Sequence, residues 1–89
     1  MKIKTGYLVH EVAGNYVVIK IGQEALNFNG LITLSESAKM LWDLLNRSEG
    51  ASLDELVNKL LEEYEIDEET AKNDTIEFIE SLKVNNILE

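Results

Sequence analysis

The first third of the chain alternates runs of β-forming residues with short turns. Residues 7–12 (Tyr-Leu-Val-His-Glu-Val) and 16–21 (Tyr-Val-Val-Ile-Lys-Ile) are rich in β-branched and aromatic side chains, which favour strands. The Ala-Gly-Asn cluster at 13–15 supplies a tight turn between them. A third run, 24–29, alternates large apolar residues with small or amide side chains. Short turns between neighbours predict an antiparallel three-stranded meander with 24–29 as its third strand.

From residue 35 onward the apolar residues recur at helical spacing. Ser35 is a candidate N-cap for a first helix, and Thr33 with Glu36 forms a rival capping box. The apolar positions that we expect this helix to turn toward the core are Ala38, Leu41, Trp42 and Leu45.

Two more helices follow, each with its own start signal. Ser52 and Glu55 form a capping box before a leucine-rich segment, and Asp67 caps a helix that is predicted to run to about Lys83. The pair Asn85-Asn86 is a stop signal, because asparagine tolerates the left-handed conformation that ends many helices. The Ile-Leu pair that follows is expected to pack back onto the core.

The predicted order of elements is therefore β-β-β-α-α-α. This is an α+β fold in which an N-terminal three-stranded antiparallel sheet precedes a three-helix, winged helix-turn-helix-like bundle. With 89 residues, of which 45% are hydrophobic, the chain is expected to form a single domain over 1–89.

Charged residues are unevenly distributed along the chain, and this limits the kinds of molecule that the protein is expected to bind. The net charge is −9, and residues 48–89 contain thirteen Asp/Glu against three Lys, whereas residues 1–47 contain four Asp/Glu and five Lys/Arg. Such a surface repels nucleic-acid phosphate and anionic lipid, so neither nucleic acid nor membrane is an expected partner. The absence of cysteine, of a signal peptide and of a long apolar run makes the cytoplasm the expected location.

No catalytic or metal-binding constellation is present in the sequence. His10 is the one histidine, and its neighbour Glu11 points to the opposite face of a strand, so adjacency does not make a dyad. The carboxylates of the second and third helices lack a calcium-loop pattern and are interpreted as a solvated face. We therefore expect a protein that is not an enzyme and binds no cofactor and no metal.

The predicted strand 24–29 is the strongest lead to a binding function. Consecutive hairpins place it at an edge of the sheet, and residues 25–29 carry no charge that would discourage strand addition. The alternatives are an edge covered by the third helix or paired with a second copy. We expect a groove between this edge and the third helix. Its predicted lining residues are Leu26, Phe28, Thr75, Phe78, Ile79 and Leu82.

The layout of the whole chain resembles the PqqD family, the small domain known as the RiPP precursor peptide recognition element. The likeness is carried by residues 6–21 and by the segment Ala-Leu-Asn-Phe-Asn-Gly-Leu-Ile-Thr-Leu-Ser at 25–35. It continues in Ala38 with 41–45, in the leucine-rich second helix, and in 74–82 with the closing 87–89. Its specificity lies in the order and spacing of these segments rather than in any one motif.

The resemblance implies a non-catalytic adaptor. Family members bind the leader region of a ribosomally made precursor peptide as a strand added to the third strand, in a cleft beside the third helix, which implies strand addition to 24–29 here. They present the peptide to a modifying enzyme, often a radical SAM enzyme. The implied partners are thus a precursor peptide and such an enzyme, with the chain itself a monomer or weak homodimer. The peptide-binding residues implied by matching segments are Ala25, Leu26, Asn27, Phe28, Asn29, Lys72, Thr75, Phe78, Ile79 and Leu82.

A winged-helix transcriptional regulator or another protein-interaction module is the alternative. The second helix of a DNA-reading pair needs cationic or amide side chains toward the bases. Here the third helix carries Glu68, Glu69, Asp74, Glu77 and Glu80 against Lys72 and Lys83, which disfavours DNA.

Overall fold

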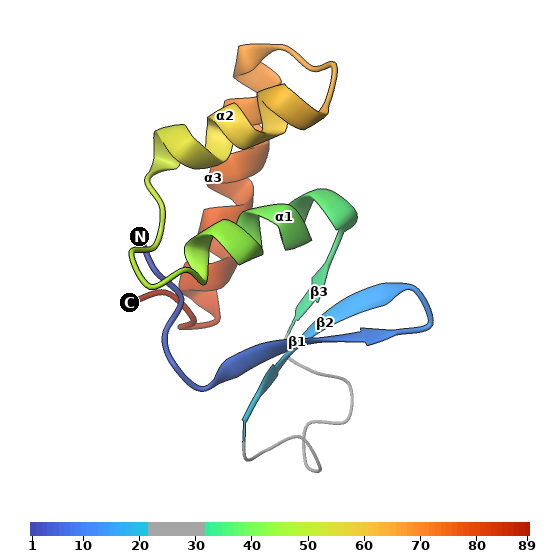
Figure 1. The fold of residues 1–89 in the computed structure, drawn as a ribbon, viewed down its shortest axis with the longest axis vertical. Coiled ribbons are helices and arrows are strands. Elements are labelled where there is room, and N and C mark those ends of the chain that lie inside the picture. Colours follow the sequence, from blue (N-terminus) through green and yellow to red (C-terminus); the bar gives the residue numbers. More distant parts are fainter. Residues whose placement is uncertain (22–31) are drawn as a thin grey trace.

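The computed structural model describes residues 1–21 and 32–89, and Figure 1 shows their arrangement. A three-stranded antiparallel sheet with strand order β1-β2-β3 is followed by three helices, which confirms the predicted fold class. The elements are β1 (Tyr7–Val12), β2 (Asn15–Lys20), β3 (Ile32–Leu34), α1 (Glu36–Leu45), α2 (Leu53–Glu63) and α3 (Glu68–Val84).

The strand that pairs with β2 differs from the predicted third strand. It is Ile32–Leu34, which pairs antiparallel with β2, whereas the predicted strand 24–29 lies outside the described residues. The alternative prediction, a capping box of Thr33 with Glu36, is wrong, because Thr33 is a residue of strand β3. Ser35, directly after the strand, caps α1 instead.

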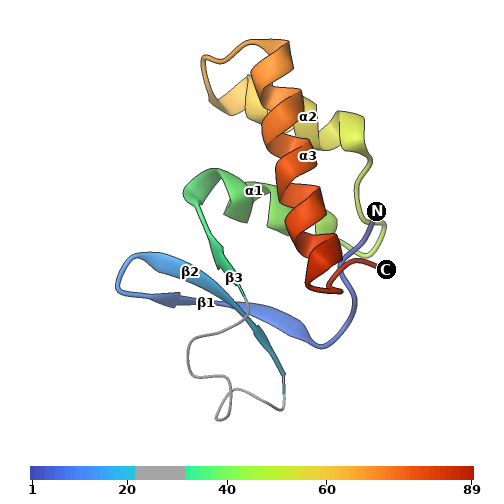
Figure 2. The same cartoon turned by 180° about the vertical axis from the view of Figure 1, so that it is seen from behind.

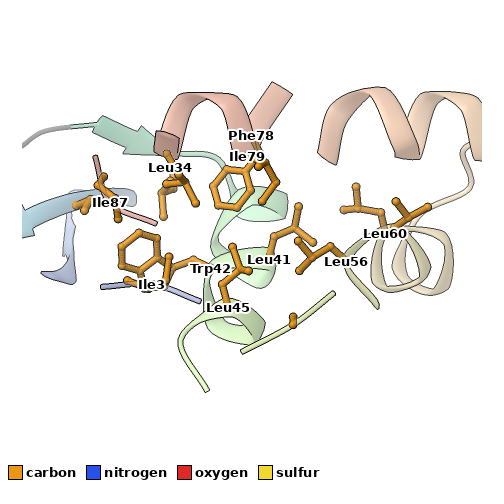
Figure 3. Close-up of a cluster of buried hydrophobic side chains, with 14 of the residues drawn as sticks. Ile3, Leu34, Leu41, Trp42, Leu45, Leu56, Leu60, Phe78, Ile79 and Ile87 are labelled. Carbon is orange, nitrogen blue, oxygen red and sulfur yellow. The ribbon is translucent and has the colours of Figure 1, made fainter. Parts of the chain in front are cut away.

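The core lies where the sheet, the helices and the two chain ends meet. In both views α1 lies between the sheet and α2, and α3 runs alongside them (Figures 1 and 2). Side chains from all of these elements meet in one cluster (Figure 3), and the predicted core positions Leu41, Trp42 and Leu45 of α1 are confirmed as buried. Ala38 packs against the same cluster.

Side-chain caps fix where the helices begin. Ser35 Oγ accepts the backbone N–H three residues on, at 3.1 Å. Ser52 and Glu55 form the predicted reciprocal capping box, with both hydrogen bonds at 3.1 Å. Asp67 Oδ1 accepts the N–H of Thr70 at 2.8 Å. Each bond satisfies a backbone donor that the first turn of a helix leaves without a partner.

The two chain ends are joined to each other and to the C-terminal end of α1. Ile3 and Leu88 form an isolated antiparallel bridge, and the N–H of Lys4 donates to the carbonyl of Ile87 at 2.8 Å. The N–H of Ile3 donates to Leu45 O at 3.2 Å. Figure 2 shows both ends side by side, next to the C-terminal end of α3 and below the N-terminal end of α2. The expected return of the C-terminal residues to the core is confirmed, since Ile87 is fully buried.

No helix in the described part of the chain combines the length and apolar character needed to cross a membrane.

Gly50 lets Met1 pack closely against the connection between α1 and α2, and a substitution there tests how much this contact stabilises the fold. Its φ is +68°, and a Cβ there would collide with the carbonyl oxygen of Met1, whose ammonium group donates to Ala51 O at 2.8 Å. Gly14 also has a positive φ, +83°, but a Cβ there meets open space. We expect Gly14→Ala to lower the free energy of unfolding by about 1–2 kcal/mol through backbone strain, and Gly50→Ala to lower it by clearly more. Urea denaturation of both variants measures this, and equal losses would contradict it.

The cap of α3 predicts an acid-dependent part of the stability. Hydrogen bonds from the side chain and the backbone of Thr70 hold the pKa of Asp67 below its ordinary value of 3.8. The folded pKa is below the unfolded one, so this stabilisation is present above the unfolded pKa and is lost as the pH falls through the folded pKa. Asp67→Asn keeps a capping acceptor without the charge. We expect it to reduce the difference between unfolding free energies measured at neutral pH and at a pH below 3.8, relative to the unsubstituted protein; an unchanged difference would contradict the assignment.

Candidate functional site

A groove of about 480 Å³ opens between β3 and α3. Its walls are the short strand β3, the start of α1 and one face of α3, with a contribution from α2. The lining residues are Ile32, Thr33, Leu34, Ser35, Ser37, Ala38, Leu41, Leu60, Asp74, Glu77, Phe78 and Ser81.

The base of this groove is apolar and its rim is polar. Leu34, Leu41, Leu60 and Phe78 are each no more than 9% exposed, and they belong to the hydrophobic core, so the bottom of the groove is an opening onto the core. Exposed polar side chains from α3 and from the start of α1 surround it. An apolar base with a polar rim suits a ligand that buries apolar side chains and keeps polar groups at its edges.

A second hollow of about 300 Å³ continues the groove toward the end of α2. It shares Ser35, Ser37, Leu60 and Asp74 with the first hollow. It adds residues from the first turn of α1 and from the α2–α3 connection, which are Glu36, Tyr64 and Ile66. The two hollows together form an elongated depression that begins at β3.

The register of the sheet determines which backbone groups of β3 face this groove. The β1–β2 hairpin closes at the pair Val12–Asn15 around a two-residue loop, Ala13 and Gly14, with φ values of +51° and +83°. Such a loop closes on a hydrogen-bonded pair, and hydrogen-bonded pairs then alternate with non-bonded pairs along the hairpin. The odd-numbered residues of β2 therefore bond to β1, and the N–H of Ile21, which donates to Gly6 O at 2.7 Å, continues this alternation.

The even-numbered residues of β2 consequently bond to β3. Their partners are Ile32, opposite Val18, and Leu34, opposite Tyr16. Thr33, opposite Val17, is a non-bonded position, so its N–H and C=O point away from β2. Within the described residues no backbone group is bonded to Thr33 on this side, and Thr33 lines the groove. β3 thus directs one backbone donor and one backbone acceptor away from β2, which is the arrangement that strand addition uses.

Three of the predicted peptide-binding residues of α3 fill the core instead of the groove. Thr75 and Leu82 are fully buried and Ile79 is 5% exposed, and none of the three lines either hollow. The hydroxyl of Thr75 donates to Ala71 O at 2.8 Å, which satisfies it within its own helix. These three side chains therefore belong to the hydrophobic core and not to the lining of the groove.

Phe78 and Lys72 lie on different sides of α3. Phe78 lines the groove at its base. Lys72 is exposed and lies two positions before Asp74, which is about 200° around the helix. Lys72 is not among the residues that line either hollow. The predicted contacts Ala25, Leu26, Asn27, Phe28 and Asn29 lie outside the described residues.

The face of α3 that lines the groove was missed by the sequence prediction apart from Phe78. Its other members are Asp74, Glu77 and Ser81, which recur at the spacing of one helix face together with Phe78. The spacing of Asp74 and Glu77 was visible in the sequence and was interpreted as a solvated surface. On β3, the β-branched run Ile32-Thr33 between a glycine and Ser35 was the available signal for a strand.

No histidine or cysteine lines the groove, so it lacks the side chains that most often act as general base or nucleophile. His10 is exposed on β1 and is not among the lining residues. Among residues 1–21 and 32–89, no group of three potential metal ligands comes together. What the groove supplies is backbone hydrogen bonding, an apolar base and carboxylates.

Comparison with known proteins identifies the family. The sequence matches the family described as Coenzyme PQQ synthesis protein D (PqqD) over residues 8–88. The chain belongs to the PqqD family. Comparison of this PqqD-family fold with solved structures finds TbiB1 in complex with the TbiA(beta) leader peptide, with a TM-score of 0.74 and 25% sequence identity; the match covers 100% of this chain and 95% of that one. No curated protein matches.

The register of β3 makes a prediction for amide hydrogen exchange. The N–H groups of Ile32 and Leu34 are expected to exchange slowly, because they face β2, whereas that of Thr33 is expected to exchange faster. NMR-detected exchange of the free protein measures the three rates. A Thr33 amide as protected as its two neighbours would contradict an open edge.

Proposed function

We propose that this protein is a non-catalytic adaptor that binds the leader region of a ribosomally synthesised precursor peptide. The leader adds as a strand to the outer edge of β3, with its side chains in the groove beside α3. The observation that carries this proposal is the outward-facing N–H and C=O of Thr33 at the mouth of a groove with an apolar base. Membership of the PqqD family and likeness to a protein that binds a leader peptide support it.

The energetics require the groove as well as the strand. Each backbone hydrogen bond contributes about 0.5–1.5 kcal/mol net, so the two outward groups of Thr33 contribute about 1–3 kcal/mol. Ordering each peptide residue costs about 1–2 kcal/mol. Strand pairing alone therefore does not hold a peptide of several residues. Apolar leader side chains buried against Leu34, Leu41 and Phe78 supply the remaining affinity and the specificity.

The adaptor role includes a second protein. A bound leader leaves the rest of the precursor outside the groove, and the groove itself offers no histidine or cysteine chemistry, so a separate enzyme modifies the peptide. A radical SAM enzyme is the proposed kind of partner. Because the precursor is made on ribosomes, the adaptor meets it in the cytoplasm. The free protein is proposed to be a monomer or weak homodimer, the dimer using the same edge of β3 that the leader takes.

The winged-helix regulator is disfavoured by the charge of α3. The helix exposes Glu68, Glu69, Asp74, Glu77 and Glu80 and has only two lysines. Docking this surface against phosphate would bring like charges together and desolvate the carboxylates.

Thr33→Pro tests strand addition directly. Proline removes the outward N–H of Thr33 without removing a hydrogen bond to β2, and edge strands tolerate proline at such a position. We expect this variant to keep its fold and to lose at least about tenfold in affinity, since it loses one bond and the steric fit of the added strand. The assay titrates isotope-labelled protein with synthetic leaders from short reading frames beside the gene. The unsubstituted protein should show amide shifts at 32–35 and 74–81.

Glu11→Pro is the matched control at the opposite edge of the sheet. Glu11 on β1 is exposed, and its N–H also points away from β2, so the same backbone change occurs far from the groove. This variant should bind as tightly as the unsubstituted protein. Equal binding by a folded Thr33→Pro variant, or loss of binding only in Glu11→Pro, would refute strand addition at β3.

A further inference from the structure

The charged residues that line the groove all have the same sign. Asp74 and Glu77 line the main hollow, and Glu36 joins Asp74 in its extension. No lysine, arginine or histidine is among the lining residues of either hollow. A ligand that lies along this depression therefore passes carboxylates and meets no cation.

These carboxylates have no cationic partner within the described residues. Neither Asp74 nor Glu77 takes part in a salt bridge there, while other carboxylates of the helices do, as in Asp43 with Lys39 at 2.8 Å. Residues 22–31 cannot supply a cation either, because that part of the sequence contains no lysine, arginine or histidine. Three lysines of the helices pair with other carboxylates: Lys39 with Asp43, Lys59 with Glu63 and Lys83 with Glu80. Lys39 also lies over the ring of Tyr16.

Acidic side chains at Asp74 and Glu77 do not stabilise the fold. Glu36 is in the first turn of α1, where a carboxylate is stabilised by the helix dipole, but Asp74 and Glu77 are in the middle of α3. Aspartate is unfavourable in a helix interior, and like charges three residues apart repel each other. The two carboxylates thus weaken the helix they are on, beside an apolar base that strengthens any ion pair made above it.

We infer that the groove selects a leader peptide whose bound strand carries a lysine or arginine side chain directed at α3, where Asp74 and Glu77 receive it. This inference rests on the proposed function and specifies its ligand: an extended peptide that combines apolar side chains for the base of the groove with a basic one at its α3 side. The charge complementarity adds specificity to backbone pairing, which by itself does not depend on sequence.

A displayed random-peptide library tests the chemistry without knowledge of the natural leader. Peptides selected on the unsubstituted protein are expected to be enriched in Lys or Arg at one position relative to the input library. The double variant Asp74→Lys/Glu77→Lys should lose this enrichment and select Asp or Glu instead. The control Glu69→Lys/Glu80→Lys makes the same change in net charge on the same helix, at exposed positions outside the groove, and should keep the basic preference.

A peptide recovered from this selection then gives the size of the effect. Exposed ion pairs contribute about 0.2–1 kcal/mol each, so Asp74→Asn/Glu77→Gln should weaken binding of that peptide roughly 2- to 30-fold. Replacing the basic residue of the peptide by its neutral analogue should weaken it similarly, and the two changes together should not add. Thermal unfolding followed by circular dichroism checks that each variant is folded.

The outcomes separate this inference from the proposed function. Binders that depend on Thr33, as judged with Thr33→Pro, but show no basic preference would overturn the inference and leave the adaptor function standing. A basic preference that the control variant loses equally would also overturn it, because net charge would then explain the selection. Binders that are indifferent to Thr33→Pro would overturn the proposed function itself.

Discussion

The antiparallel pairing of β3 with β2 is the constraint on which the rest of the structure depends. It places Leu34 in the core and turns the backbone of Thr33 outward, and α1 begins only two residues after this strand ends. The position of α1 then places α3 across from β3, with the groove between them. A shift of one residue in this register would reverse both facts, burying Thr33 and exposing the apolar side chains. The site is thus a consequence of the same pairing that closes the core.

The parts of the fold that sequence predicts well are those set by local rules. The caps at Ser35, Ser52 and Asp67 depend on a side chain and the next three residues, and all three are in place. The buried stripe of α1 follows from helical periodicity in the same way. The α+β order could be predicted because the first two strands and the three helices each carry a signal of their own.

The parts that sequence predicts poorly depend on contacts between distant segments. Strand Ile32–Leu34 is too short for a periodicity, and only its partner β2 makes it a strand. The apolar positions of α3 identified one face, but Thr75, Ile79 and Leu82 turn to the core while the polar neighbours of Phe78 turn to the groove. The position at which a helix crosses the sheet determines which of its faces is buried and which borders an opening. The sequence of α3 alone does not contain this information.

The bridge between Ile3 and Leu88 also determines how the protein can be joined to other molecules. Both chain ends are held at the C-terminal end of α1, through Ile3 and Leu45, whereas the groove begins at the N-terminal end of that ten-residue helix, about 15 Å away. Because the two ends lie side by side, a second protein fused to either end would be placed on nearly the same side of the groove. A circular permutant reopened at the Ala13-Gly14 loop would retain that geometry as well.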